Sequence, residues 1–186
     1  RLGFYGVIDE RFDIDLLRQM ADMRPNWSFV MVGPVAKIGE DELPRAANIH
    51  YLGGKTYEQL PTYLSGWDVA LMPFAMNEST QFISPTKTPE YLAGGKPVVS
   101  TPVRDVVRTY GHLQGVHIAS DADGFVRCCE KALEQVREGG DWLAEADLLL
   151  SASSWDITQA SMAGLVREKL GERAEQDASA LLVAAE

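Results

Sequence analysis

The sequence predicts an α/β protein, built as a doubly wound parallel sheet of about six strands with helices on both faces. Short apolar runs alternate with helical patterns along the chain, as expected of strands that are buried on both faces. Glycines and polar residues gather after the strands, where ligands bind in such sheets. The 186 residues, 46% of them hydrophobic, suffice for one well-buried domain.

The spacing of apolar residues, and the glycines and prolines that interrupt it, predict each strand and helix. Strands are expected at residues 2–8, 27–32, 48–52, 69–72, 97–100 and 116–119. Helices are expected at residues 13–24, 57–65, 86–94, 103–110, 121–150 with a break near 139–140, and 154–170. A tail at 173–186 is expected to fray. The remaining 1–172 would form the domain with its C-terminal helices.

Several conspicuous residues have ordinary structural interpretations. The Asp-x-Asp pairs that begin at Asp13 and Asp121 directly precede helices, so we interpret them as helix caps rather than metal ligands. Trp142 and Trp155 are expected to pack helices. The adjacent cysteines Cys128 and Cys129 indicate a reduced protein without a disulfide.

Composition excludes several classes of function. The net charge of −10 argues against nucleic acid as a partner. No apolar run approaches the roughly 20 residues needed to span a bilayer. The chain opens at Arg1 without an initiator Met. We therefore expect a piece of a longer protein and can predict no targeting segment.

Residues 83–100 carry the most specific signal. The segment ISPTKTPEYLAGGKPVVS predicts a loop, a helix and a buried strand. Thr86 or Thr88 is expected to cap the helix. Lys87 beside a helix N-terminus indicates an anion site, and Glu90 in the first turn can accept hydrogen bonds from a diol. A phosphate together with a diol suggests a nucleotide.

This block resembles the donor-binding half of group 1 (GT4-like) GT-B glycosyltransferases, in particular a bacterial cell-surface polysaccharide branch. The likeness runs from about residue 2 to about residue 170. It implies a Rossmann-like domain in which Glu90 binds the ribose and the preceding loop holds the diphosphate. As alternatives from the residues alone, Glu90 complements the helix dipole and Lys87 is a surface cation.

The resemblance also assigns roles to other loops. Lys87 and Arg11 would neutralise the leaving diphosphate, which makes them the expected catalytic groups. The remaining donor-binding residues would be Gly6 at the phosphates, Gly33 and Gly53 beside the base, Ser84 and Thr86 as hydroxyl or N–H donors, and Asn77 and Glu78 near the sugar. Tyr57 either stacks on the base or packs in the core.

The chain departs from the family pattern at two places. Phe82 stands where many relatives carry a second Glu that contacts the transferred sugar. Val7 stands where many relatives carry an Arg, and Arg11 would replace that Arg with an offset. These departures leave donor-sugar recognition without an assigned residue.

By resemblance, the function is sugar transfer from a UDP- or GDP-linked donor to a polysaccharide or lipid-linked acceptor. Transfer would be retaining and would need neither metal nor cofactor. The acceptor domain would be absent from this chain, which alone would be inactive. The enzyme would be cytoplasmic, either free or peripheral at the inner face of the membrane. The alternatives are half of a GT-B-like sugar-nucleotide epimerase and a non-catalytic nucleotide-sugar-binding domain.

Overall fold

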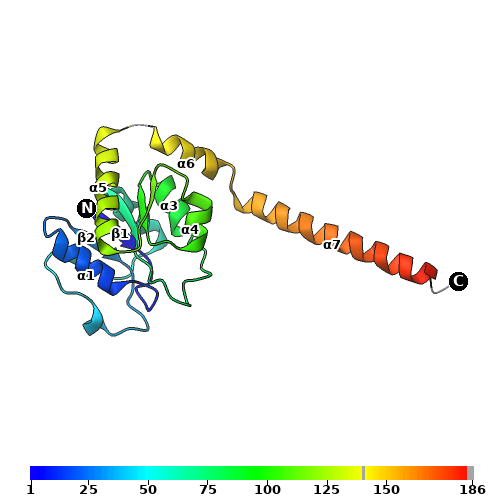
Figure 1. The fold of residues 1–186 in the computed structure, drawn as a ribbon, viewed down its shortest axis with the longest axis horizontal. Helices are drawn as coiled ribbons and strands as arrows, with labels where there is room; N and C mark the ends of the chain where they lie inside the picture. The colour runs from blue at the N-terminus through cyan, green and yellow to red at the C-terminus, as the bar shows by residue number, and fades with distance from the viewer. Residues whose placement is uncertain (140, 184–186) are drawn as a thin grey trace. The chain divides into compact units, whose positions relative to one another are not determined.

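The computed structural model of the chain describes residues 1–139 and 141–183, and side chains as far as Arg173. Six parallel strands form one sheet in the order β3-β2-β1-β4-β5-β6 (Figure 1). The strands are β1 (Leu2–Tyr5), β2 (Phe29–Val32), β3 (Ile49–Tyr51), β4 (Val69–Met72), β5 (Val98–Ser100) and β6 (Val116–Ile118). The predicted fold class is confirmed.

Helices connect the strands, as parallel pairing requires. They are α1 (Ile14–Met23), α2 (Leu60–Ser65), α3 (Lys87–Ala93), α4 (Arg104–Tyr110), α5 (Ala122–Glu138), α6 (Trp142–Ser151) and α7 (Trp155–Val183), with 3-10 turns η1 (Glu40–Glu42) and η2 (Tyr57–Gln59). Asp13 and Asp121 cap α1 and α5, accepting from the amides of Leu16 at 2.8 Å and Gly124 at 2.7 Å. Their predicted capping role is confirmed.

The core lies between the sheet and the helix pair α1 and α5. These two helices contact each other, and α5 also contacts β4, β5 and β6. Aromatic and aliphatic side chains from strands and helices meet there, with relative exposure of 4% or less: Leu2, Phe4, Leu17, Met20, Phe29, Leu71, Val99, Phe125 and Cys129.

The strand order changes direction between β1 and β4. The chain first adds β2 and β3 on one side of β1, then returns to add β4, β5 and β6 on the other. In open parallel sheets the crevice at this reversal, beyond the carboxyl ends of the strands, is where ligands bind. The loop after β1 and the loop after β4 border that crevice.

Some predicted boundaries were wrong for local reasons. Strand β1 ends at Tyr5 rather than at residue 8, because Gly6 adopts a φ of 142° and Ile8 makes only an isolated bridge to Val35. Thr86 occupies the N-cap position of α3, but its side chain makes no capping hydrogen bond. Thr88 is buried inside the helix and donates to Sδ of Met72 at 3.2 Å.

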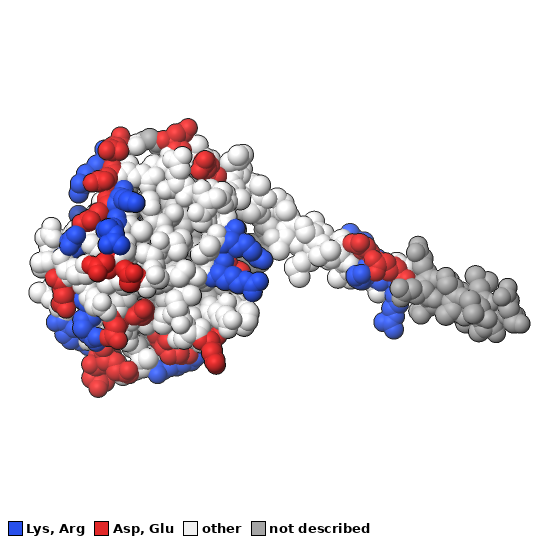
Figure 2. All heavy atoms as spheres, viewed as in Figure 1, with Lys and Arg blue, Asp and Glu red and all other residues white. Residues whose placement is uncertain are grey.

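The chain divides into two compact units, Arg1–Asp147 and the part from Leu148 onward. The sheet and every predicted site residue lie in the first unit. In the view of Figure 2, acidic and basic side chains of that unit are interspersed, so charge on this face is mixed.

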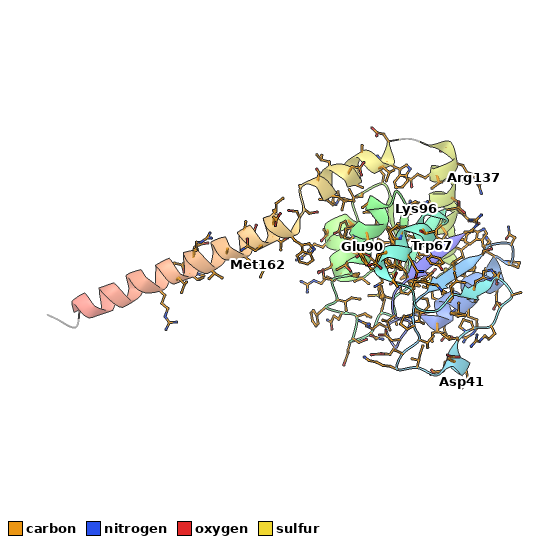
Figure 3. All side chains as sticks on the ribbon, turned by 180° about the vertical axis from the view of Figure 1, so that it is seen from behind. Asp41, Trp67, Glu90, Lys96, Arg137 and Met162 are labelled. Carbon is orange, nitrogen blue, oxygen red and sulfur yellow. The ribbon has the colours of Figure 1, made fainter. Side chains whose placement is uncertain are left out.

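In the second unit, α7 continues past residue 170 to Val183. Along this helix Trp155 is 84% exposed and Met162, labelled in Figure 3, is 63% exposed. The prediction that Trp155 packs between helices is therefore wrong, whereas Trp142 is buried as predicted. No described helix is long and apolar enough to cross a membrane.

Candidate functional site

Lys87 lies in a partly enclosed position at the start of α3. Its ammonium nitrogen is 5.8 Å from the ring centre of Phe4 and 6.0 Å from that of Phe74. Aromatic faces attract a cation. Burial nevertheless lowers the pKa of Lys87, while the nearby Glu90 carboxylate opposes that shift. A desolvated cation that can be neutralised by an incoming anion is suited to binding phosphate.

Gly6 makes this position possible. A Cβ at Gly6 would come within 2.4 Å of Cε and 3.0 Å of Nζ of Lys87. The φ of 142° also disfavours any other residue there. The backbone after β1 therefore lies directly against the ammonium group, as the predicted close approach to phosphate requires.

The three predicted site glycines follow one another across the carboxyl ends of β1, β2 and β3. The amide of Gly33 donates to the carbonyl of Gly53 at 2.9 Å, and a Cβ at Gly33 would meet the carbonyl oxygen of Gly6 at 1.8 Å. Gly53 has a φ of 66° and open space where a Cβ would stand. Together the glycines leave a backbone-lined surface beside the crevice.

Arg11 is held by a residue that sequence reasoning missed. Asp9, 3% exposed, accepts from Nε of Arg11 at 3.0 and 3.1 Å and from a terminal nitrogen at 2.6 Å. These hydrogen bonds lower the pKa of Asp9 and raise that of Arg11. Arg11 is thus a fixed cation that is already paired with a neighbouring carboxylate.

Backbone contacts tie the Arg11 loop to the loop after β4. The carbonyl of Arg11 accepts from the amide of Ala75 at 2.8 Å, and Phe12 forms an isolated bridge with Phe74. Phe74 is one of the two rings beneath Lys87. The two predicted diphosphate partners are therefore brought to the same end of the sheet, and the charge of Arg11 helps to lower the pKa of Lys87.

Glu90 projects from the first turn of α3 (Figure 3), as predicted. Its Oε2 accepts a hydrogen bond of 2.6 Å from the hydroxyl of Tyr5, at the end of β1. Beside it is a cavity of about 320 Å³ with a largely apolar lining. The lining residues are Tyr5, Tyr57, Leu60, Pro61, Leu64, Glu90, Ala93 and Gly94.

Tyr57 stands at the rim of this cavity with 73% of its surface exposed. Of the two interpretations of Tyr57, packing in the core is therefore wrong. An exposed ring at the edge of an apolar cavity is available for stacking on a planar ligand.

The polar residues of the loop after β4 are less tightly defined. Asn77 is exposed. Its Oδ1 accepts from the amide and hydroxyl of Ser79 at 3.0 and 2.6 Å, and its Nδ2 donates to the carbonyl of Glu10 at 3.5 Å. Glu78, Ser84 and Thr86 are exposed, and their side chains have no hydrogen-bond partner within the described part of the chain. Phe82 is 75% exposed. The predicted contacts of these loop residues with a donor stay predictions.

The arrangement joins a desolvated cation, a carboxylate one helical turn later and an adjacent apolar cavity. A phosphate, a diol and a planar base would each meet a suitable group. In the described residues, no cluster of His, Cys, Asp and Glu could hold a metal ion.

Comparisons with known proteins identify the family of this chain. Residues 1–135 match the sequence model of the family "Glycosyl transferases group 1". The chain is 32% identical over 142 residues to TuaH of Bacillus subtilis strain 168, described as a teichuronic acid biosynthesis glycosyltransferase. That match covers 72% of this chain and 35% of TuaH.

Solved structures show the same fold. HepE of Anabaena, crystallised with UDP and glucose, superposes with a TM-score of 0.69 at 15% identity, over 89% of this chain and 47% of HepE. The sucrose-phosphate synthase of Thermosynechococcus elongatus gives 0.73 at 17% identity, over 92% and 46%. The chain thus spans about a third to a half of the relatives that it matches.

The fold is the Rossmann-like α/β fold of the GT-B glycosyltransferases. Within that class, the chain belongs to the group 1 glycosyltransferase family.

Proposed function

We propose that this chain is the donor-binding domain of a glycosyltransferase that uses a nucleoside diphosphate sugar, with UDP as the first candidate nucleotide. Lys87 would bind the diphosphate, assisted by Arg11, and Glu90 would accept hydrogen bonds from the ribose. The observation that carries this proposal is that Lys87 and Glu90 lie about one turn apart on α3, with Glu90 lining an apolar cavity. The structural relatives crystallised with UDP or UDP-glucose support the choice of nucleotide.

The proposed reaction transfers a sugar to a hydroxyl of a polysaccharide or a lipid-linked acceptor. The bond between the sugar C1 and the β-phosphate oxygen breaks, and C1 forms a glycosidic bond with the acceptor oxygen. The acceptor hydroxyl releases its proton to solvent, and the nucleoside diphosphate leaves with the bonding electron pair and one additional negative charge. Lys87 and Arg11 would stabilise that charge because both are positioned before it develops.

Two finer features rest on the family resemblance. We propose retention of configuration at C1 and a reaction that needs no metal or cofactor. Metal independence is supported by Lys87 and Arg11, whose positive charges would stabilise the leaving diphosphate as a metal ion does in other enzymes. A location in the cytoplasm, peripheral at the inner face of the membrane, fits such a donor.

The acceptor site is expected elsewhere in the whole protein, because the chain covers only 35% of TuaH and 47% of HepE. We therefore propose that the 186-residue chain binds the nucleotide weakly and transfers nothing. Sugar transfer catalysed by this chain alone contradicts the proposal.

Calorimetric titration of the chain with UDP, GDP, ADP and dTDP tests the donor site. One nucleotide should bind saturably, and Lys87→Ala or Glu90→Ala should weaken it by about tenfold or more, because a hydrogen bond to a charged group contributes roughly 1.5–3 kcal/mol.

Lys96→Ala is the matched control. Lys96 lies in the same sequence block, but its Nζ donates to the carbonyl of Ser65 at 3.2 Å and it does not line the cavity. This variant should bind as wild type does. If Lys96→Ala and Lys87→Ala weaken binding equally, the effect is a general loss of charge and the assignment of Lys87 fails.

The alternative functions have their own readouts in the whole protein. Interconversion of the donor sugar without an acceptor indicates the epimerase, and binding without transfer indicates a non-catalytic domain.

A further inference from the structure

Tyr5 is a buried residue that the site uses and that sequence reasoning assigned to the strand alone. It ends β1, is 7% exposed, and lines the cavity together with Glu90. Its hydroxyl donates to Oε2 of Glu90 at 2.6 Å. That distance is typical of a strong hydrogen bond from a hydroxyl to a carboxylate.

The core fixes the position of this hydroxyl. The amide of Tyr5 donates to the hydroxyl of Tyr91 at 3.0 Å, and the two rings meet edge to face at 4.8 Å between centres. The ring of Trp67 lies 5.9 Å from that of Tyr5. Trp67 fits there because Gly3 has no Cβ, which would stand 2.0 Å from the indole. Tyr5 therefore has little freedom to rotate away from Glu90.

Tyr5 is the donor of the hydrogen bond to Glu90 at every pH at which the protein would be assayed. Burial and the hydrogen bond to Glu90 raise the pKa of Tyr5 far above its ordinary value, so Tyr5 stays protonated and donates. Within the described part of the chain, Oε1 of Glu90 has no hydrogen-bond partner. One carboxylate oxygen is thus held by the protein, and the other is free to accept from a ligand in the cavity.

We propose that Tyr5 is a positioning residue that orients the Glu90 carboxylate and thereby sets the preference of the site for a nucleotide that carries a full ribose diol. The proposal rests on the proposed function, since it needs a nucleotide in the cavity. Tyr5 acts through Glu90 and need not touch the ribose itself.

The test compares UDP with 2′-deoxy-UDP in wild type and in Tyr5→Phe, by calorimetric titration of the 186-residue chain. Wild type should prefer UDP. Tyr5→Phe should weaken UDP binding by roughly three- to tenfold, as for the loss of one hydrogen bond, and should leave 2′-deoxy-UDP binding much less affected. The preference for the ribose therefore collapses. An equal loss for both nucleotides indicates a structural role and overturns the proposal, as does an unchanged preference.

Two further variants sharpen the result. In a Glu90→Gln background, Tyr5→Phe should cause no additional loss of preference, because Tyr5 acts only through the carboxylate. Tyr51→Phe is the matched control: it also removes one phenolic hydrogen bond, to the carbonyl of Pro44 at 3.3 Å, and should keep the wild-type preference. An additional loss in the Glu90→Gln background overturns the proposal.

Failure of the proposed function gives a different result. If wild type binds neither nucleotide, the donor site itself is wrong and Tyr5 has nothing to position. If wild type binds UDP but Tyr5→Phe keeps its preference, only the inference about Tyr5 fails.

Discussion

Gly6→Ala should disable the Lys87 position without removing the lysine. A Cβ at residue 6 would stand 2.4 Å from Cε of Lys87, far inside contact distance, and the flexible lysine side chain is the part that must move. Its ammonium group then leaves the rings of Phe4 and Phe74. We expect UDP binding to weaken by about tenfold to about 100-fold, because a charge-assisted hydrogen bond contributes roughly 1.5–3 kcal/mol and each 1.36 kcal/mol is a factor of ten.

The same change also strains the backbone, so its two effects must be separated. Alanine at a φ of 142° should lower the free energy of unfolding by about 1–3 kcal/mol. Gly139→Ala is the matched control, since Gly139 also has a positive φ, of 69°, with no atom within 4 Å of a Cβ. It should cost stability of the same order and leave UDP binding unchanged.

Urea unfolding and calorimetric titration with UDP measure the two quantities on the same samples. If Gly6→Ala binds UDP as tightly as wild type, Gly6 does not hold Lys87 in a binding position. The same conclusion follows if Gly139→Ala weakens UDP binding as much as Gly6→Ala does.

Three further predictions concern the strand, the cation and the buried carboxylate. Gly3→Ala should lower the free energy of unfolding by about 1–3 kcal/mol or more, because its Cβ would stand 2.0 Å from the buried Trp67 ring. Urea unfolding measures this loss, and a variant as stable as wild type contradicts the prediction. Since burial lowers the pKa of Lys87, UDP affinity should fall at a lower pH than the deprotonation of an ordinary lysine would cause, and Lys87→Arg should flatten that profile. Parallel profiles refute the role of the lysine proton. Hydrogen bonds from Arg11 lower the pKa of Asp9, so the ion pair stabilises the fold above the unfolded-state pKa of Asp9 and this stability is lost as pH falls through its folded-state pKa. Asp9→Asn should remove that part of the acid dependence of stability, measured by urea unfolding. An unchanged acid dependence in Asp9→Asn contradicts the stabilising role of the pair.

The local motif predicted one stretch of the fold and the placement of two candidate site residues. Residues 83–100 fixed the loop, the helix and the following strand, and they placed Lys87 and Glu90 on one turn of α3. Local structure can be predicted here because the residues that start and stop the helix lie within a few positions of each other in the sequence.

The partners of these residues could not be predicted from local pattern. Tyr5 lies 85 residues from Glu90 and looks like any aromatic residue in an apolar strand. Asp9 looks like a loop carboxylate, and only the folded chain shows that it is buried against Arg11. Contacts between distant segments depend on the packing of the sheet, which a single sequence does not reveal.

The boundary errors have the same origin. Val7 and Ile8 extend the apolar run of β1, but the backbone at Gly6 turns out of the strand before them. Trp155 has a large apolar side chain of the kind that usually packs in a core, yet it is 84% exposed on α7. A pattern of apolar residues indicates that a surface is to be covered and leaves open which segment covers it.

The most direct test of the central claim is a crystal structure of this chain with UDP. We expect the ribose hydroxyls within hydrogen-bonding distance of Glu90, the diphosphate beside Lys87 and Gly6, and the base in the cavity next to Tyr57. UDP bound at another place on the domain, with Lys87 and Glu90 free of it, would show that the donor site has been assigned wrongly.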